Sequence, residues 1–247
     1  GAQQELLDAV LATKTPTVVT LLAGRPYALG AAAREAAAIV QTFFPGEEGT
    51  RAIAGVLGGR VNPSGRLPVS VPASAGSQPT TYLGAPLARR NNVSNVDPTP
   101  AFAFGHGLGY TTFDWAALPA DAANVPIDGS VTVAVEVRNA GSRDGADVVQ
   151  LYLHDPVASV TRPDVRLAGY ARVTLDPGRS VRLTFDFSAD LTSFTGISGQ
   201  RIVEPGDIEL RVSASSSDVR HVVRLRLVGP TRVVDSSRRL VAGVTMR

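Results

Sequence analysis

The residues best placed to do chemistry lie in a glycine-rich segment, FGHGLGYTTF, which spans residues 104–113. It contains His106, one of three histidines in the chain, with a glycine on each side. An imidazole titrates near neutral pH, so a histidine in a pliable loop is a candidate acid or base. However, the segment holds no carboxylate, and flanking glycines also suit a tight structural turn. We therefore interpret His106 as structural, with a place near a cleft as the alternative.

A pair of carboxylates, Glu47 and Glu48, is the second candidate. Adjacent helix positions do not face one another, so the pair cannot straddle a bond to be cleaved. Carboxylates in the first turn of a helix stabilise the helix dipole, which is the better interpretation. The chain also lacks a GxSxG elbow, a P-loop lysine and an HExxH motif. We assign this chain no catalytic residue, no metal and no cofactor.

Composition narrows the class of protein. The chain has 247 residues, no cysteine, and a formal net charge of +2 from 24 basic and 22 acidic residues. Disulfides and thiolate zinc sites are excluded, and no basic run suggests a nucleic-acid partner. No apolar run approaches a membrane span. The first residues lack the basic region of a signal peptide, so we expect any such peptide upstream of residue 1. A secreted and a cytoplasmic bacterial protein both stay possible.

The first part of the chain alternates helical and strand patterns. Apolar spacing predicts helices over 3–13 and 47–59. Continuous apolar runs predict strands over 17–24 and 38–44, and a shorter strand over 67–71. This alternation is typical of an α/β layer with a mostly parallel sheet and flanking helices. Three strands are too few for a complete doubly wound domain, so we expect a partial α/β sandwich.

The second part of the chain has a different pattern. An irregular loop, 73–103, is rich in Pro, Ser, Asn and Gly, and is followed by the segment 104–113. From about residue 128, short segments alternate apolar and polar residues between turns, which is typical of an all-β sandwich of the fibronectin type III or immunoglobulin kind. The predicted strands are 131–137, 148–156, 171–175, 180–187, 201–204, 208–215 and 221–228.

Several motifs together resemble the C-terminal region of glycoside hydrolase family 3. The most specific is FFPGEEGTRAIAGVLGGRVNPSGRLPVSVP at 43–72, similar to the family's Pro-Gly-x-Glu-Gly helix and Asn-Pro-Ser-Gly-Arg-Leu-Pro turn. FAFGHGLGYTTFDW at 102–115 resembles a second family element, with Gly109 where Ser is common. The stretch 148–187 resembles the fibronectin type III-like domain that often ends such enzymes, and TVVTLLAGRPYAL at 17–29 a strand and turn of the α/β sandwich domain.

The resemblance implies a partner and a chemistry that lie outside this chain. Family members join a TIM-like barrel to the α/β sandwich, and hydrolyse glycosides with retention using two carboxyl groups about 5–5.5 Å apart. In the family, the nucleophilic Asp belongs to the barrel, and the acid/base Glu lies before a conserved stretch of the sandwich domain. The first residues of this chain, GAQQELLDAV, resemble the end of that stretch. No residue here matches either position. We expect an N-terminal barrel and the first part of the sandwich, in the same polypeptide or an associated chain, as partner.

The resemblance also divides the chain. We expect the latter part of the α/β sandwich domain over 1–116, the fibronectin type III-like sandwich over 117–230, and a final strand or tail over 231–247. We interpret 104–113 as a structural joint between the two. Its packing residues are Phe104, His106, Leu108, Tyr110 and Phe113.

The function implied is that of a β-glucosidase part that hydrolyses terminal β-D-glucosyl residues, with this chain giving support and part of the cleft rim. Candidate contacts to the glycoside on the aglycone side are Tyr82, Asn91 and Asn92. The alternatives are a β-xylosidase of the same family, a non-catalytic carbohydrate-binding or spacer module, and an inactive family member. Because its apolar strands need cover, we expect the chain alone to aggregate or pack loosely.

Overall fold

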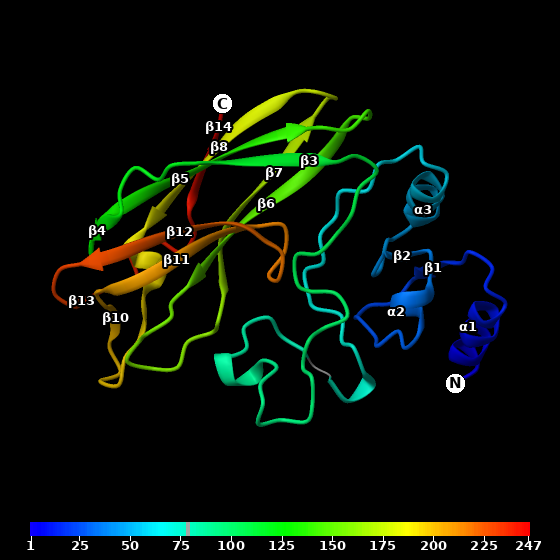
Figure 1. Cartoon of the computed structure of the whole chain (residues 1–247), viewed down its shortest axis with the longest axis horizontal. Helices are drawn as coiled ribbons and strands as arrows, with labels where there is room; N and C mark the ends of the chain where they lie inside the picture. Colours follow the sequence, from blue (N-terminus) through cyan, green and yellow to red (C-terminus); the bar gives the residue numbers. More distant parts are fainter. Residues whose placement is uncertain (78–79) are drawn as a thin grey trace.

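The computed structural model describes residues 1–77 and 80–247. The N-terminal part contains helix α1 (Ala2–Ala12), strand β1 (Val18–Leu21), helix α2 (Ala32–Glu35), strand β2 (Ala38–Gln41) and helix α3 (Gly49–Leu57). β1 and β2 pair in parallel, with Val19 opposite Ile39. The prediction of parallel strands between helices is confirmed, and we call residues 1–72 the α/β part (Figure 1).

A small apolar core holds the α/β part together. Leu11 from α1 and Ala32 from α2 are buried against Leu29 and Val71. The faces of β1 and β2 are only half buried, because a two-stranded sheet has few neighbours to cover it. A continuous apolar run such as 17–24 suits a strand that is covered on both faces, and this cover is not achieved within this chain.

Two local predictions in the α/β part are wrong. Segment 67–71 forms no strand of the sheet; Val71 makes one isolated antiparallel bridge to Phe102 instead. Pro68 has no N–H to donate to a ladder, which weakens a strand at this point. Glu47 and Glu48 lie just before the first turn of α3, and Glu48 makes no side-chain capping bond.

The irregular loop contains two short 3₁₀ turns, η1 (Ala75–Ser77) and η2 (Pro86–Ala88). Gln78 and Pro79, within this predicted loop, lie outside the described residues. The loop extends below the rest of the chain in Figure 1, between the α/β part and the sandwich.

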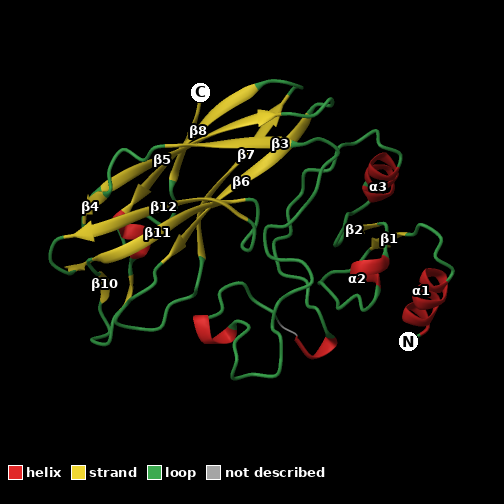
Figure 2. Ribbon diagram, in the orientation of Figure 1, coloured by secondary structure: helices red, strands yellow, loops and turns green. Residues whose placement is uncertain are grey.

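The C-terminal part is a two-sheet β-sandwich (Figure 2). One sheet has the order β4-β12-β11-β6-β7, and the other the order β14-β8-β5-β3. A small third sheet, β13-β10-β9, follows the 3₁₀ turn η3 (Ala189–Thr192). The strands are β3 (Phe113–Leu118), β4 (Asn124–Pro126), β5 (Ser130–Asn139), β6 (Gly145–His154), β7 (Arg166–Leu175), β8 (Ser180–Ser188), β9 (Phe194–Thr195), β10 (Arg201–Val203), β11 (Gly206–Ser213), β12 (Val219–Val228), β13 (Arg232–Val233) and β14 (Gly243–Met246).

Alternating side chains from both sheets fill one continuous core. Val133, Val135 and Val137 of β5 face Leu183 and Phe185 of β8 across the ladder or beside it, and all are essentially inaccessible to solvent. All seven strands predicted from alternation are confirmed in type, with longer bounds for most of them. The period-two pattern thus records which face of each strand meets the opposite sheet.

Two strands lie at or beyond the predicted domain limits. β3 pairs along its whole length with β5, so its hydrogen bonds belong to the sandwich although it crosses the predicted boundary at 116/117. β14 pairs with β8, which makes the end of the chain a strand rather than a free tail.

Candidate functional site at the interdomain joint

The segment 104–113 connects the α/β part to the sandwich, and the residues around it form a joint between the two. Three families of contact build it: a buried ion pair, a set of amide and carbonyl hydrogen bonds, and an aromatic stack. Each joins side chains that lie far apart in the sequence.

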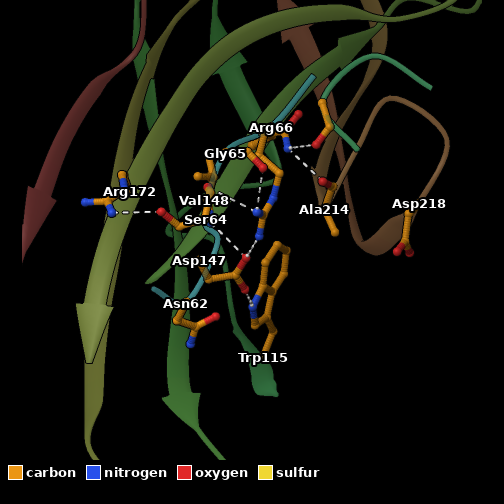
Figure 3. A network of polar contacts seen from close by, with 12 residues as sticks. Asn62, Ser64, Gly65, Arg66, Trp115, Asp147, Val148, Arg172, Ala214 and Asp218 are labelled. Carbon is orange, nitrogen blue, oxygen red and sulfur yellow. Dashed lines mark hydrogen bonds and ion pairs between the residues drawn. The ribbon is translucent and has the colours of Figure 1, made fainter. Parts of the chain in front are cut away.

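The ion pair is at the centre of Figure 3. Arg66, from the Asn-Pro-Ser-Gly-Arg-Leu-Pro turn, donates from Nη2 to Oδ1 of Asp147 on β6 at 2.6 Å. Trp115 on β3 donates from Nε1 to the other carboxylate oxygen at 2.9 Å. The backbone N–H of Val148 also donates to Oδ1, at 2.8 Å. We call Arg66, Asp147 and Trp115 the polar network.

The charged groups of the polar network are buried, so they need hydrogen-bond partners within the protein. The Asp147 side chain is 10% exposed and the Arg66 side chain 14%. An ion removed from water in this way must find its partners within the protein, or its desolvation is not repaid. Because both carboxylate oxygens of Asp147 accept bonds, this carboxylate holds structure and is not free to act as a base.

Asn62 connects the Asn-Pro-Ser-Gly-Arg-Leu-Pro turn by hydrogen bonds to the segment 104–113 and to the sandwich. Its Oδ1 accepts from the backbone N–H of Tyr110 at 2.7 Å, and its Nδ2 donates to the carbonyl of Asp144 at 2.8 Å. Two arginines of the sandwich reach back across the same boundary. Arg143 donates to the carbonyl of Gly59 at 2.5 Å, and Arg172 donates to Oγ of Ser64 at 2.9 Å (Figure 3).

Gln150 lies at a crossing of three chain segments. Its Nε2 donates to the carbonyls of Gly105 at 3.1 Å and Ala214 at 2.7 Å, and its Oε1 accepts from the hydroxyl of Tyr152 at 2.6 Å. Gly105 has a φ of +81°, and a Cβ there would lie 2.0 Å from Oε1 of Gln150. Glycine is therefore required at this position both by backbone conformation and by space.

Tyr82, a candidate for contact with the glycoside, packs in the joint. Its ring stacks on Phe104 at a centroid distance of 4.1 Å and meets Tyr152 edge-on at 6.1 Å. Its hydroxyl accepts from the backbone N–H of Leu167 at 3.4 Å. Burial raises the pKa of the Tyr152 hydroxyl, and the neighbouring Tyr82 adds to the effect. The stack anchors the irregular loop to the sandwich.

His106 stacks on Phe102 with ring centroids 5.5 Å apart. Its carbonyl accepts from the N–H of Leu67 at 2.8 Å. Burial lowers the pKa of its imidazole, the nearby Arg66 lowers it further, and Asp218 opposes the shift. A neutral, stacked ring suits the structural interpretation of His106.

The other predicted joint residues divide into two groups. Phe113 packs against the sandwich core, and the Tyr110 hydroxyl donates to the carbonyl of Val56 at 2.8 Å. Leu108 is 75% exposed, so the expectation that it packs in the joint is not met within this chain. The glycines on either side of Leu108 pass close to the backbone carbonyls of Gly65 and Pro63, while the Leu108 side chain points into solvent.

The two asparagines of the loop also differ. Asn91 shapes a turn: its Nδ2 donates to the carbonyls of Leu87 and Arg89, and its Oδ1 accepts from the N–H groups of Val93 and Ser94. Asn92 is exposed. Of the three residues predicted to meet the glycoside, Asn92 presents an exposed side chain.

Arg66, Asp147, Trp115 and Gln150 were not singled out from the sequence. One signal was available: Asp147 and Gln150 are polar residues within the otherwise apolar run of β6. A polar side chain on a buried strand needs a partner, but the pattern does not identify which one.

The contacts of the joint position the α/β part relative to the sandwich, and among the described residues they do not form a metal site. Over residues 1–77 and 80–247 no three His, Asp or Glu side chains gather as a metal site would need. No helix within the described part of the chain has both the length and the apolar character to cross a membrane.

Comparison with known families identifies both halves. The model described as the glycosyl hydrolase family 3 C-terminal domain matches residues 1–110. A second model, the fibronectin type III-like domain, matches residues 147–216.

Among curated proteins, the periplasmic beta-glucosidase of Salmonella typhimurium is 37% identical over 229 residues, which cover 89% of this chain and 30% of that protein. A beta-xylosidase of Formosa agariphila is 37% identical over 219 residues, covering 87% of this chain and 30% of that protein. The chain thus spans about 30% of the length of these relatives.

Solved structures give the same fold. A β-glucosidase from Erythrobacter marinus superposes with a TM-score of 0.84 at 39% identity, covering 92% of this chain and 30% of that one. A beta-glucosidase from Listeria innocua in complex with glucose gives 0.86 at 29% identity, over 93% of this chain and 33% of that one.

Proposed function

Because the chain belongs to glycoside hydrolase family 3, as the C-terminal portion of such an enzyme, we propose that it is part of a β-glucosidase. The reaction is hydrolysis of terminal β-D-glucosyl residues of oligosaccharides or glycosides, with retention of configuration. Relatives named as beta-glucosidases, similar over about nine-tenths of this chain, support the assignment.

The role of this chain in that enzyme is to hold the α/β part against the sandwich. The observation that carries this role is the polar network, in which one carboxylate of β6 takes hydrogen bonds from Arg66 and Trp115. A buried pair of this kind tolerates little change in distance or angle. The joint therefore sets the position of the α/β part, and with it anything that rests on that part.

The partner that we propose is the N-terminal barrel and the first part of the sandwich domain. Large apolar side chains of the α/β part are exposed in this chain, including Leu6, Leu22 and Phe44. Large apolar side chains left in water favour an interface in this part of the chain. The much greater length of the relatives provides the portion that would cover it.

The irregular loop 73–103 is proposed to border the aglycone side of the cleft. Tyr82 and Asn91 hold the loop in shape, and Asn92 is its exposed candidate for contact with a glycoside. The joint supports the loop through the stack of Tyr82 on Phe104.

A β-xylosidase is the second candidate, favoured by the relative from Formosa agariphila. A carbohydrate-binding module is less well supported. Such modules stack exposed aromatic rings on sugars, but Tyr152, Phe185, Phe187 and Phe194 are buried in the sandwich. Tyr170, 64% exposed, is the aromatic ring of these strands that faces solvent.

The test is an assay of two proteins on the 4-nitrophenyl β-glycosides of glucose and xylose. The full-length protein that carries this chain should hydrolyse the glucoside faster than the xyloside. Residues 1–247 alone should hydrolyse neither, since no catalytic carboxyl pair is assigned here. Turnover by the isolated chain would overturn the supporting role, and faster hydrolysis of the xyloside would establish the second candidate. Failure of the full-length protein on both would leave a non-catalytic module.

A further inference from the structure

A hollow of about 300 Å³ opens between the β6–β7 loop and the segment that carries β9 and β10. β10, whose Arg201 lines this hollow, is labelled at one end of the sandwich in Figure 1. Three arginines line it: Arg162 and Arg166 from the loop and the start of β7, and Arg201 from β10. Among the described residues that line the hollow there is no carboxylate. Ser193 and Thr195 add hydroxyl groups to its wall.

The protein holds these guanidinium groups in place with backbone carbonyls. Arg201 donates from Nη2 to the carbonyl of Ser193 at 2.7 Å, and Arg166 donates to the carbonyl of Leu191. Arg162 donates to the carbonyl of Thr192 at 3.0 Å and lies over the ring of Phe194 at 4.5 Å. Carbonyl oxygens orient the three cations, but a carbonyl group carries no net charge and does not neutralise them.

Carboxylates near the hollow balance only part of this charge. Asp155 accepts from Arg162 at 3.1 Å, and Glu204 accepts from the N–H of Ser159 at 3.1 Å. A fourth arginine, Arg238, lies close enough to lower the pKa of Arg201, for which burial is the larger cause. Burial and then the other arginines also lower the pKa of Arg166. The cluster is therefore short of negative charge.

Donors also remain without acceptors. Nε of Arg166, which lines the hollow, and Nε of Arg238, which lies outside the lining, are buried and have no hydrogen-bond partner among the described residues. Positive charge that is removed from water without full compensation favours the binding of a negatively charged group nearby. A guanidinium presents its donors in a planar fork that matches the oxygens of carboxylate and phosphate groups.

We propose that this hollow, which we call the arginine pocket, is a binding site for a compact oxyanion, a carboxylate or phosphate group. Arg201 and Arg166 provide charged N–H donors from two walls, and the hydroxyl of Ser193 donates while its Oγ accepts from Arg201 at 3.3 Å. The ligand is an acidic sugar, such as a uronate, or a free phosphate. The site does not depend on the proposed hydrolase activity, because none of its residues lies in the joint.

Titration calorimetry at low ionic strength tests the proposal on the full-length protein that carries this chain. Inorganic phosphate and D-glucuronate are the probes, and sodium chloride at the same ionic strength is the control. We expect saturable binding of at least one oxyanion and none of chloride. Phosphate alone or glucuronate alone would each support the site and identify the source of the oxyanion.

Variants locate the binding. Arg201→Gln should raise the Kd about tenfold or more, because a charge-assisted donor is lost. Arg201→Lys keeps the charge without the fork and should raise the Kd less. Arg179→Gln, an exposed arginine elsewhere, makes the same change in net charge and should leave the Kd unchanged. Thermal melts confirm that each variant is folded. Absence of saturable binding, or equal weakening by Arg179→Gln, would overturn the proposal.

Discussion

The β-sandwich and the α/β part of this chain differ in how completely they bury their own apolar side chains. Phe185 and Phe187 of β8 are sealed between two sheets. In the α/β part, Phe44 is 83% exposed and Leu22 is 63% exposed. Both parts contain regular, hydrogen-bonded strands, so the difference does not arise from secondary structure.

The difference lies in the number of neighbours. β5 pairs with β3 on one edge and β8 on the other, and a second sheet covers its inner face. Among the described residues, β1 and β2 pair only with each other, which leaves each with an open edge. A sandwich that closes on itself satisfies its own apolar faces, whereas a two-stranded sheet needs cover from outside. Substitutions in the two parts, and in the joint between them, should therefore differ in their cost to stability.

The largest effect should come from Phe185→Ala in the sandwich. Removing a fully buried aromatic ring leaves a cavity and should lower the free energy of unfolding by about 3–5 kcal/mol. Leu22→Ala is the matched control in the α/β part, and should change it by less than about 0.5 kcal/mol because its side chain is already in water. Urea unfolding of residues 1–247, at a protein concentration where light scattering shows a monomer, measures both. Similar costs at the two positions would contradict the comparison.

Asp147→Ala should have the next largest effect, about 3 kcal/mol, because it leaves Arg66 and the indole of Trp115 without their shared acceptor. Trp115 is the single tryptophan of the chain, so its fluorescence reports on the joint directly. Asp144→Ala, an exposed position close by, is the control and should leave both the fluorescence and the unfolding midpoint unchanged. If Asp147→Ala kept the wild-type emission, the polar network would not hold the joint.

Gly105→Ala should cost about 1–3 kcal/mol, because an L-residue is strained at this positive φ and its Cβ would collide with Gln150. Gly76→Ala is the comparison, since a Cβ there has open space. The measurement is the thermal midpoint of each variant. Equal midpoints for the two variants would show that the Gly105 turn is not under steric constraint.

The smallest effect concerns the pH dependence at His106. Burial lowers its pKa in the folded protein, so below about pH 6.5 the unfolded chain binds a proton more readily than the folded one. The stability that depends on neutral His106 is present above this pH and decreases as the pH falls toward the folded pKa. His106→Gln should remove this loss. Urea midpoints at pH 8 and pH 5.5 measure it, and parallel changes in wild type and variant would exclude the effect.

Much of the fold could be predicted because its signals are local. The helical spacing over 3–13 corresponds to α1, and the alternation over 131–137 and 180–187 corresponds to β5 and β8. These periods depend on a few neighbouring residues and on the side of the element that is buried. The prediction for 67–71 was wrong because an apolar run does not show whether a partner strand lies beside it.

The joint could be predicted only in part. The glycine-rich segment 104–113 was identified as a joint from its motif, but the contacts that support it were not. Arg66 and Asp147 are 81 positions apart, and no local pattern relates them. Tyr82 was a candidate for contact with the glycoside, and no pattern in the sequence indicated that its ring stacks on Phe104.

Periodicity and motifs are properties of neighbouring residues, so they were enough to predict the two classes of structure, their order along the chain and the family. The packed fold was needed to show which polar side chains meet, that the carboxylate of Asp147 is occupied, and that three arginines line one hollow. Ion pairs and shared hollows depend on distances across the fold, and these distances exist only once the sheets have packed.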